Sequence, residues 1–422
     1  MYELIENLNK DEFEQFVFNN QKSHFLQSYY WGNVAMHKHF FPYYIGLKKD
    51  NILVGTALLL EKKVLKNIGY IYCPRGFITD YNDFNTVKEF TKLLKIFTKK
   101  HNDMFLRIDP DIKLQNLDND GNIIGEENNF KLVDNLIKLG FKHKGFNKNF
   151  ENSQPRYTYR LNIDKDIETI KKGFHPSTRC ILNKENPYDL DIYLGDESDI
   201  LAFYTTMQET AKRENIIQSD ITYYKNFYSI LNKKNMSDIY VVKANIESLK
   251  DNYNNKIMTS KKEIEAINNN KKKNINKTNN LINDLNNKIN KLTNELKEIE
   301  QIKEKEIVLS SIITVKYHDL IWTVHGGNHS LLRFINANYF LYYKIIKDAN
   351  IQGYKTFDFF GTTGNPIPSN PLYGIHLFKK RFGGEYMEFI GEFDLVTKKF
   401  FYYSYNFFIK LRNIKKLLKS KQ

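Results

Sequence analysis

Hydrophobic and polar positions follow two periods along the first 140 residues. Alternating or continuous apolar runs predict strands, whereas apolar positions spaced three and four apart predict helices. Between these elements, Asn116–Asn129 is expected to be a polar loop. Strands that alternate with helices predict an α/β or α+β fold. The expected strands are Tyr43–Leu47 and Leu53–Leu60 around a turn at Lys49–Asn51, Ile68–Cys73 and Phe105–Ile108, and the expected helices are Ile5–Phe18, Asn85–Lys99 and Phe130–Leu139.

The same order of elements starts again at Tyr157. A basic segment, Arg179–Lys184, lies early in this second part, and a loop rich in glycine, Gly361–Gly374, lies late in it. Two successive units of roughly 150 residues predict a duplicated fold, although no repeat is visible residue by residue. The expected strands are Tyr157–Ile163, Leu190–Leu194, Ile239–Lys243, Val308–Lys316, Leu320–Val324 and Thr356–Phe360, and the expected helices are Ile167–Phe174, Asp196–Glu214 and Asn336–Ala349.

Residues 245–306 have a different composition, without glycine or proline and rich in Lys, Asn, Glu, Ile and Leu. A weaker apolar stripe from Ile246 to Ile267 and a regular one are separated by the polar run Asn268–Asn274, which predicts an antiparallel coiled-coil arm. Its 13 Lys and 10 acidic residues sum to only +3. The arm either packs without chemistry or contacts an extended macromolecule. The regular stripe is Ile282, Leu285, Ile289, Leu292, Leu296 and Ile299.

The last 25 residues, 398–422, contain eight basic residues and no acidic one, interleaved with Tyr, Phe, Leu and Ile. This pattern is typical of an amphipathic helix that can lie on an anionic lipid surface. The alternative is a packed helix with a solvated basic end.

The whole chain is also basic. Its 422 residues carry 63 Lys+Arg against 49 Asp+Glu, a net charge of +14 with a pI near 9.2. This balance favours anionic partners such as nucleic acid, phosphorylated metabolites or an anionic membrane face, unless it is a general lysine bias without functional meaning. With 41% hydrophobic and 14% aromatic residues, the chain can bury a large core, and its length predicts two or three domains.

Several classes of protein are excluded. The two cysteines, Cys73 and Cys180, cannot form a disulfide framework or a Cys-type zinc site, and no metal ligands are predicted. The acidic, polar start and the short apolar runs predict a cytoplasmic protein without a secretory signal or membrane span. No two glycines have G-x-G spacing and none precedes a lysine, so a glycine-rich loop for a nucleotide cofactor or acetyl-CoA is not expected.

The richest chemistry follows the last expected strand. Phe378, Lys379, Lys380 and Arg381 stand together before Gly383-Gly384, and cationic side chains there can hold an anion or stabilise an oxyanion. Asp109 follows a strand and precedes a proline, so it is either a structural turn residue or a base. Other short motifs, such as ETAKRE at Glu209–Glu214, are weak when taken alone.

Taken together, these motifs resemble the Fem (FemABX) family of aminoacyltransferases, which build peptidoglycan interpeptide bridges. They occur in family order and cover nearly the whole chain outside the arm, and an arm at this position resembles the longer branch of the family. The matching segments are FLQSYYWG (Phe25–Gly32), PRG (Pro74–Gly76), RIDP (Arg107–Pro110), QPRYTYRLNI (Gln154–Ile163), TRCILNKE (Thr178–Glu185), ETAKREN (Glu209–Asn215), YY (Tyr223–Tyr224), DFFGTTG (Asp358–Gly364) and GIHLFKKRFGGEYMEFIGEFD (Gly374–Asp394).

The resemblance implies two acetyltransferase-like (GNAT-like) subdomains. Their expected bounds are 1–153 plus 389–422 and 154–244 plus 307–388, with the arm at 245–306. It also implies transfer of an amino acid of the glycine, serine or alanine type from aminoacyl-tRNA to a lipid-linked or UDP-linked muropeptide. No cofactor is expected, because an aminoacyl ester is already activated. Implied partners are aminoacyl-tRNA, the muropeptide, the inner face of the cytoplasmic membrane and other bridge-forming transferases.

The resemblance also assigns residues. Lys379 matches the lysine of the family's Phe-Lys motif and is expected to stabilise the ester or the oxyanion, beside Phe378, which shapes the pocket. Asp109 matches a candidate base, although substrate-assisted proton transfer remains open. The residues expected to contact the substrate are Arg213, Tyr223, Tyr224 and Arg381, whereas Arg75 and Trp31 are expected to support the first subdomain, with Arg75 also a candidate for substrate binding.

The sequence departs from relatives that use UDP-linked muropeptides. Ala35 stands where those relatives place a diphosphate-binding lysine, with Lys38 close by as the candidate substrate contact, and Ser219 replaces an arginine. A lipid-linked acceptor is therefore preferred. A non-catalytic tRNA- or membrane-binding protein on a degenerate transferase fold remains the alternative, and the absent pyrophosphate loop disfavours an acetyl-CoA transferase.

Overall fold

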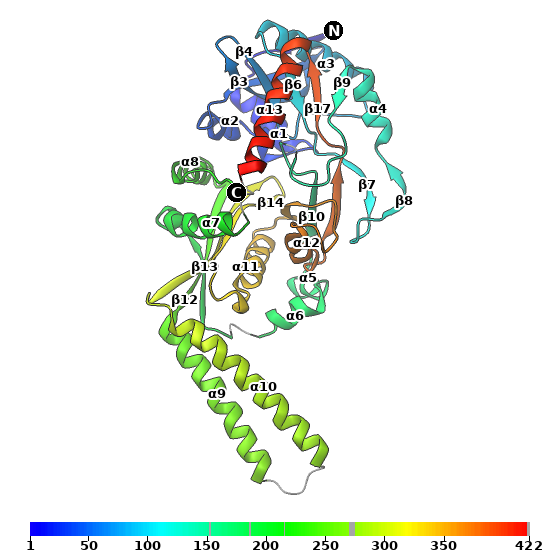
Figure 1. Ribbon diagram of the computed structural model, residues 1–422. Helices are drawn as coiled ribbons and strands as arrows, with labels where there is room; N and C mark the ends of the chain where they lie inside the picture. The colour runs from blue at the N-terminus through cyan, green and yellow to red at the C-terminus, as the bar shows by residue number, and fades with distance from the viewer. Residues whose placement is uncertain (152, 185–186, 215, 270–274, 420–422) are drawn as a thin grey trace.

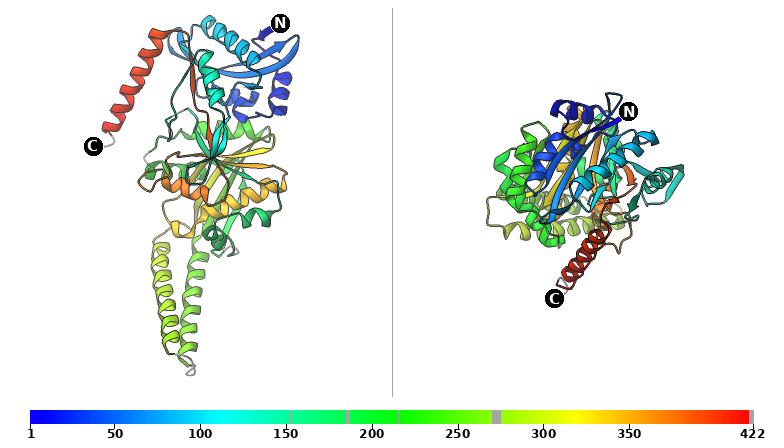
Figure 2. Two further views of the ribbon diagram at one scale, coloured as in Figure 1. Left: turned by 90° about the vertical axis from the view of Figure 1, so that its right-hand side faces the viewer. Right: turned by 90° about the horizontal axis from the view of Figure 1, so that it is seen from above.

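The computed structural model describes residues 1–151, 153–184, 187–214, 216–269 and 275–419. Two mixed sheets lie one above the other, and a pair of long helices projects beyond the second sheet (Figures 1 and 2). The chain is therefore a mixed α/β protein with two successive sheets, which confirms the fold class predicted from the sequence.

The first sheet is built mainly from the N-terminal part of the chain. Its strands are β1 (Tyr2–Ile5), β2 (Phe41–Lys49), β3 (Ile52–Leu65), β4 (Ile68–Cys73), β5 (Ile78–Thr79), β6 (Phe105–Ile108), β9 (Phe141–His143) and β17 (Phe393–Val396). They follow the order β1-β2-β3-β4-β6-β17-β9, with β5 beside β3, and β4 runs parallel to β6. Its helices are α1 (Lys10–Asn19), α2 (Tyr29–Met36), α3 (Phe84–Lys100) and α4 (Phe130–Lys138), with the 3₁₀ turn η1 (Phe25–Gln27).

The second sheet takes strands from both halves of the chain. They are β7 (Lys113–Leu117), β8 (Ile123–Asn128), β10 (Tyr157–Asn162), β11 (Leu190–Gly195), β12 (Ser237–Asn245), β13 (Glu306–Tyr317), β14 (Leu320–Asn328), β15 (Thr356–Thr362) and β16 (Glu385–Phe389). Their order is β11-β12-β13-β14-β15-β10-β16-β7-β8, and β14 is parallel to β15. Thus β7 and β8, which lie within residues 1–153, pair into the second sheet through β16.

The helices of this second part are α5 (Ile167–Lys172), α6 (Pro176–Leu182), α7 (Ile200–Glu214), α8 (Ile221–Asn232), α11 (Ala337–Ile351) and α12 (Tyr373–Lys380), with 3₁₀ turns η2 (Glu197–Asp199) and η3 (Arg333–Ile335). The bounds of β4 and β6 agree with the prediction. The first helix begins later than expected, at Lys10, because the Asn9 side chain accepts hydrogen bonds from the Asp11 and Glu12 N–H groups and caps it.

The loop expected at Asn116–Asn129 is wrong, because Ile123–Asn128 form the edge strand β8. All six residues of β8 are exposed, and the strand pairs with β7 alone. A strand without a buried face has no alternation of apolar and polar residues, so its sequence carries no strand signal.

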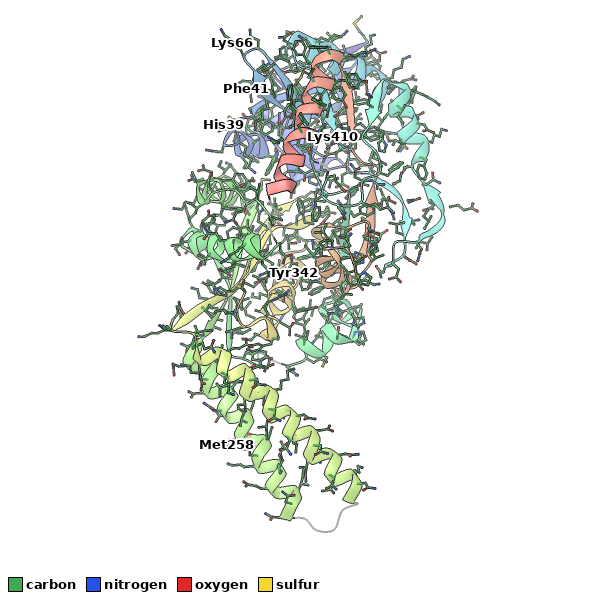
Figure 3. The ribbon with its side chains drawn as sticks, viewed as in Figure 1. His39, Phe41, Lys66, Met258, Tyr342 and Lys410 are labelled. Carbon is green, nitrogen blue, oxygen red and sulfur yellow. The ribbon has the colours of Figure 1, made fainter. Side chains whose placement is uncertain are left out.

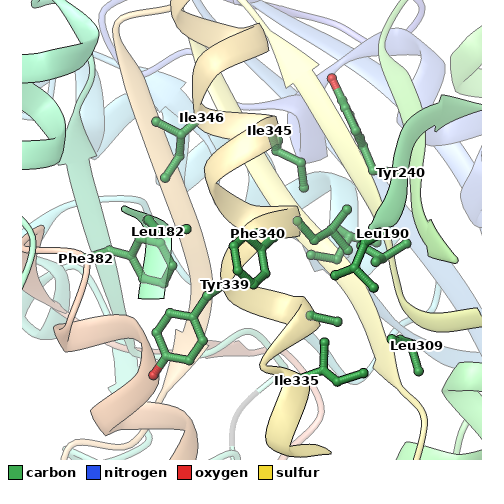
Figure 4. Packing of buried hydrophobic residues seen from close by; sticks show 14 of the residues in the cluster. Leu182, Leu190, Tyr240, Leu309, Ile335, Tyr339, Phe340, Ile345, Ile346 and Phe382 are labelled. Carbon is green, nitrogen blue, oxygen red and sulfur yellow. The ribbon is translucent and has the colours of Figure 1, made fainter. Parts of the chain in front are cut away.

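Three apolar cores hold the layers together. One lies under the first sheet and contains Phe90, Leu94 and Ile108. A second fills the second sheet, where α11 lays Phe340 and Ile345 against the strands (Figure 4). The third joins the two sheets, since it combines Phe25, Leu26, Leu58 and Leu60 from the first part with Tyr224, Ile239, Ile313 and Trp322 from the second. This shared core fixes how the two halves meet.

The arm consists of α9 (Ile246–Asn269) and α10 (Ile275–Glu300), which lie side by side (Figures 1 and 2). Their 24 and 26 residues correspond to about 36 and 39 Å of helix. The predicted stripe on α10 is the less exposed face of that helix, with Leu285, Leu296 and Ile299 buried. Part of the expected turn, residues 270–274, lies outside the described residues, and coiled-coil packing stays a prediction.

The last helix, α13 (Lys399–Lys419), follows β17 and points away from the body (Figure 2). No helix within the described part of the chain is long and apolar enough to cross a membrane.

Candidate functional site

A small pocket lies where the two halves meet. The first half contributes His24, beside η1, and Arg75, at the end of β4, while Trp322 of β14 packs its ring 4.9 Å from the His24 ring. The pocket has room for about one water, 10 Å³, so it is a closed polar joint rather than a chamber for a whole substrate. The remaining lining residues are Pro155, Thr158, Arg160, Asp358, Phe360, Gly361 and Phe389.

Arg160 of β10 is the centre of the charges around this pocket. Its Nε donates to Asp358 Oδ2 at 2.8 Å, and its Nη2 donates to Asp111 Oδ2 at 2.6 Å. Burial alone would raise the pKa of Asp111, but the Arg160 and Arg75 guanidinium groups hold it well below its usual range. Burial also lowers the pKa of His24 to about 3, so the imidazole is neutral beside Asp111. Asp111 therefore remains charged, and Asp111 and Asp358 together fix the Arg160 guanidinium.

The backbone turns sharply beside this cluster. Phe360 has a φ of 60°, which is uncommon for a residue with a Cβ. Its N–H donates to Asp358 Oδ1 at 2.7 Å, and its carbonyl accepts the Thr158 hydroxyl at 2.9 Å. A Cβ added to Gly361 would lie 2.5 Å from Pro155, so only glycine fits after the turn. These contacts hold two successive carbonyls in place.

Lys379 of α12 binds those two carbonyls. Its Nζ donates to Phe360 O at 3.0 Å and to Gly361 O at 2.5 Å, and only 4% of the residue is exposed. Burial lowers the pKa of Lys379 to about 7, although the Asp358 charge opposes the shift. The next residue, Lys380, instead pairs with Asp120 at the surface. An ammonium that gains or loses its proton near neutral pH thus adjoins the pocket.

Asp109 contacts Arg75, a residue of the pocket lining. It accepts the Arg75 N–H at 2.6 Å and the Tyr72 hydroxyl at 2.8 Å. Burial raises the pKa of Asp109 to about 7, with Glu392 adding to the rise and Arg75 opposing it. The Arg75 side chain donates to Pro155 O at 2.7 Å, so Arg75 connects both halves of the chain. Asp109 and Lys379 thus each contact residues that line the pocket, Asp109 through Arg75 and Lys379 through Phe360 and Gly361.

A second group of predicted residues lies on α2 and α8. The Lys38 ammonium stands 3.7 Å above the centre of the Tyr223 ring, a cation–π contact. The His325 ring of β14 meets the Tyr224 ring at 5.2 Å, and its Nε2 is buried without a hydrogen-bond partner among the described residues. Lys62 donates to the Lys38 carbonyl at 3.2 Å, which adds a second cation. The exposed Lys38, with Lys62 beside it, is suited to an anion.

Strand β14 connects the two groups. Trp322 lines the pocket, His325 underlies Tyr223 and Tyr224, and Asn328 O accepts Arg213 Nη1 at 3.2 Å. At about 3.3 Å per residue, the six steps from Trp322 to Asn328 span roughly 20 Å. Arg213, the tyrosine pair and the pocket are therefore arranged in a line rather than around one point.

The other predicted residues lie elsewhere. Phe378 packs against Tyr339, Tyr342 and Phe382 in the core of the second sheet. Arg381 donates to the Tyr339 hydroxyl at 3.2 Å on that same side. Trp31 contacts Phe25 and Phe227 in the core that joins the sheets. The structure thus places Arg75 in the pocket lining and Lys379 and Asp109 in contact with lining residues, and it leaves Phe378 and Arg381 apart from the pocket.

Sequence reasoning assigned no role to the charged centre of the pocket. Arg160 and Asp358 both lie inside matched segments, QPRYTYRLNI and DFFGTTG, but are 198 positions apart. His24 precedes FLQSYYWG directly, and Asp111 follows RIDP directly. A charged residue in an otherwise apolar strand was the available signal, because a buried charge requires a partner.

Comparison with known proteins identifies the family and the overall fold. The sequence model of the FemAB family matches residues 8–410. The chain is 27% identical to a lipid II:glycine glycyltransferase of Staphylococcus epidermidis over 403 residues, 94% of each chain. It is 26% identical to the enzyme of the same name from Staphylococcus haemolyticus over 400 residues, 93% of each chain. A solved structure, the crystal structure of FemX, superposes with a TM-score of 0.73 at 26% identity, covering 95% of this chain and 98% of that one.

Proposed function

The chain belongs to the FemAB family, and from that premise we propose that it is an aminoacyl-tRNA-dependent aminoacyltransferase of peptidoglycan synthesis. The curated relatives are named for transfer of glycine to lipid II. We infer the same acceptor class here, a lipid-linked precursor with a free amine on its stem peptide or bridge. The donated amino acid is a small one of the glycine, serine or alanine type.

The observation that carries the proposal is the buried Lys379 beside the pocket. When an amine attacks an aminoacyl ester, the carbonyl oxygen of the ester becomes an oxyanion that a positive group must stabilise. Lys379 in its charged form supplies that group. Its Nζ is positioned by the hydrogen bonds to the Phe360 and Gly361 carbonyls. The tRNA 3′-oxygen then leaves, and a peptide bond replaces the ester bond.

Proton transfer is assigned to Asp109. The attacking amine must lose a proton, and a carboxylate with a pKa near neutrality accepts one efficiently. Burial raises the pKa of Asp109 to about 7, which suits this role. The free energy that drives peptide-bond formation is already stored in the activated ester, so the proposed reaction requires no cofactor.

The acceptor is assigned to the side of Lys38 and Tyr223. A diphosphate is the anionic part of a lipid-linked precursor, and Lys38 with Lys62 supplies two cations at an exposed position. From there the peptide part follows β14 toward Trp322, over a distance of about 10 Å for three residues. The precursor is bound at the inner face of the cytoplasmic membrane, where other bridge-forming transferases are candidate partners.

The decisive experiment is a transfer assay with the full chain, total charged tRNA and a lipid-linked muropeptide, followed by mass analysis of the product. A mass gain of one or more small amino acids supports the proposal. Binding of tRNA without any transfer indicates the alternative, a non-catalytic binding protein on a transferase fold. Faster turnover with a soluble UDP-linked muropeptide would contradict the preference for a lipid-linked acceptor.

A further inference from the structure

One face of α13 is fixed to the body of the protein. The Tyr402 hydroxyl donates to Asp394 Oδ2 at 2.9 Å, and its ring meets Phe105 at 5.3 Å. One turn later, the Tyr405 ring lies 5.7 Å from Tyr70. Tyr402 is 4% exposed, so this face anchors the helix on β4 and β6.

The opposite face of α13 is apolar and exposed. Phe400, Tyr403, Phe407 and Leu411 are spaced by three, four and four residues, which places them on one stripe of a helix. With Phe408 they are between 39% and 77% exposed. Figure 2 shows that the helix projects away from the body toward its C-terminal end. A stripe of four exposed aromatic side chains and a leucine on a projecting helix indicates a contact outside the chain.

The charge of this segment indicates the chemistry of the contact. After Asp394, the chain has eight basic residues and no acidic one. In the arm, the other projecting element, 13 Lys are balanced by 10 acidic residues. Aromatic and basic side chains together suit the interface of an anionic bilayer, where rings enter the headgroup layer and cations meet phosphates.

A second exposed patch adjoins the strands on which α13 rests. Phe40 contacts Tyr70, the same ring that meets Tyr405, and is followed by the exposed Phe41. The tip of the β3–β4 hairpin adds Val64 and Leu65, both exposed, next to Lys66. Figure 3 shows Phe41 and Lys66 along one edge of the first subdomain.

The same strip reaches the residues proposed to bind the acceptor. The Lys62 ammonium lies 4.8 Å above the Phe40 ring, and Lys62 also donates to the Lys38 carbonyl. Aromatic and lysine side chains therefore continue from the root of α13 to Lys38 and Tyr223.

We propose that the exposed face of α13 (Phe400, Tyr403, Phe407, Phe408 and Leu411) docks on an anionic lipid bilayer, with Phe41 and the Val64–Lys66 tip as a second contact. The helix lies on the surface and does not cross it. The proposal extends the proposed function, because docking here presents the Lys38 side of the protein to a precursor anchored in the same membrane.

The test is flotation of the full chain with vesicles of phosphatidylcholine alone or with phosphatidylglycerol. The wild-type chain is expected to bind the anionic vesicles at least about tenfold more tightly. The Phe407→Ser/Phe408→Ser double variant and the Lys399→Glu/Lys410→Glu double variant should each lose at least about tenfold in binding. The control is Leu201→Ser/Ile351→Ser, which removes two exposed apolar side chains from α7 and α11 and should bind normally.

Transfer to a water-soluble acceptor separates this proposal from the proposed function, since the α13 variants should transfer at the wild-type rate. Vesicle binding without any transfer keeps the docking surface and rejects the enzyme. Wild-type binding by both α13 variants, or no binding by the parent chain, overturns the docking surface. Loss of tRNA binding with unchanged vesicle binding assigns α13 to RNA instead, and a chain that is dimeric only with these phenylalanines intact assigns it to a second copy.

Discussion

The pocket at the junction of the sheets and the projecting helix α13 use cationic side chains in opposite ways. Around the pocket, Arg160 and Lys379 are bound by carboxylates or carbonyls at 2.5 to 3.0 Å. On α13, Lys410 and Arg412 are exposed on a segment without any acidic residue. The first arrangement fixes geometry, whereas the second creates a positive surface.

The difference has physical consequences. Buried charges act at short range in a medium of low dielectric, so the loss of one partner has a large effect. Exposed charges are screened by salt within about 8 to 10 Å, so each one contributes little and their effect is additive and dependent on ionic strength. Changes at the pocket should therefore be large and specific, and changes at the surface should be small and graded.

The largest effect is expected for Lys379→Met. Removing the only group assigned to the oxyanion should lower turnover by about a thousandfold, while tRNA binding stays near normal. The matched control is Lys380→Met, one residue along, where the lost partner is the surface residue Asp120. A Lys379→Met variant that retains a tenth of the parent's turnover in the transfer assay would contradict the assignment.

Asp358→Ala tests the charge network itself. It leaves Arg160 with Asp111 as its remaining carboxylate, so the free energy of unfolding should fall by about 3 kcal/mol. Glu89→Ala breaks the exposed pair with Lys92 and should change that free energy by less than about 0.5 kcal/mol. Urea denaturation followed by circular dichroism measures both, and equal effects would erase the contrast between buried and exposed charges.

The pH profile sharpens the roles of the two groups with shifted pKa values. Asp109 accepts a proton only when ionised, so activity should fall below a pH of about 7; Lys379 stabilises an oxyanion only when charged, so activity should fall above about 7. Asp109→Asn should lower kcat/KM by about a hundredfold and remove the acidic limb. An acidic limb that persists in this variant would assign proton transfer to another group, such as the substrate.

The smallest effect is expected at the exposed acceptor side. Lys38→Ala should raise KM for the lipid-linked acceptor about tenfold, with kcat little changed, because it removes one solvated cation. Tyr223→Phe keeps the ring beneath Lys38 and should behave like the parent. The control is Lys10→Ala, because Lys10 of α1 stands over the Tyr29 and Tyr30 rings of α2. An equal rise in KM in that variant would show that the Lys38 effect is a general loss of charge.

Most elements with a buried face were predictable from the sequence, with helix α8 as an exception, whereas the fully exposed strand β8 was not. Strands β4 and β6 and helix α3 show strong apolar periods, and their bounds agree with the prediction within one residue. Strand β8 has no buried residue and was expected to be a loop. Helix α8 was not predicted at all, although Asp220 caps it and Phe227 and Leu231 on it are buried.

The site was predictable only in part. Lys379, Asp109 and Arg75 were identified through the family resemblance; Arg75 lines the pocket, and Lys379 and Asp109 contact residues of its lining. Arg160 and Asp111 are 49 positions apart and Arg160 and Asp358 are 198 apart, so no local pattern connects them. Phe378 and Arg381 were expected at the site because they neighbour Lys379, but neighbours on a helix point in different directions, and both side chains contact Tyr339 instead.

The sequence alone determined the periods of the strands and helices, the arm, the basic aromatic tail and the family motifs, because each depends on residues close together in the chain. The tertiary structure decided which charges meet. Strand β10 lies between β15 and β16, and its pairing with β15 places Arg160 opposite Asp358. The packing of helix α12 brings Lys379 to the Phe360 and Gly361 carbonyls of β15. The pairing of distant strands cannot be inferred from local periodicity. The lysine residues of the sequence predict a positive charge, but they do not show which lysine is buried with a pKa of about 7.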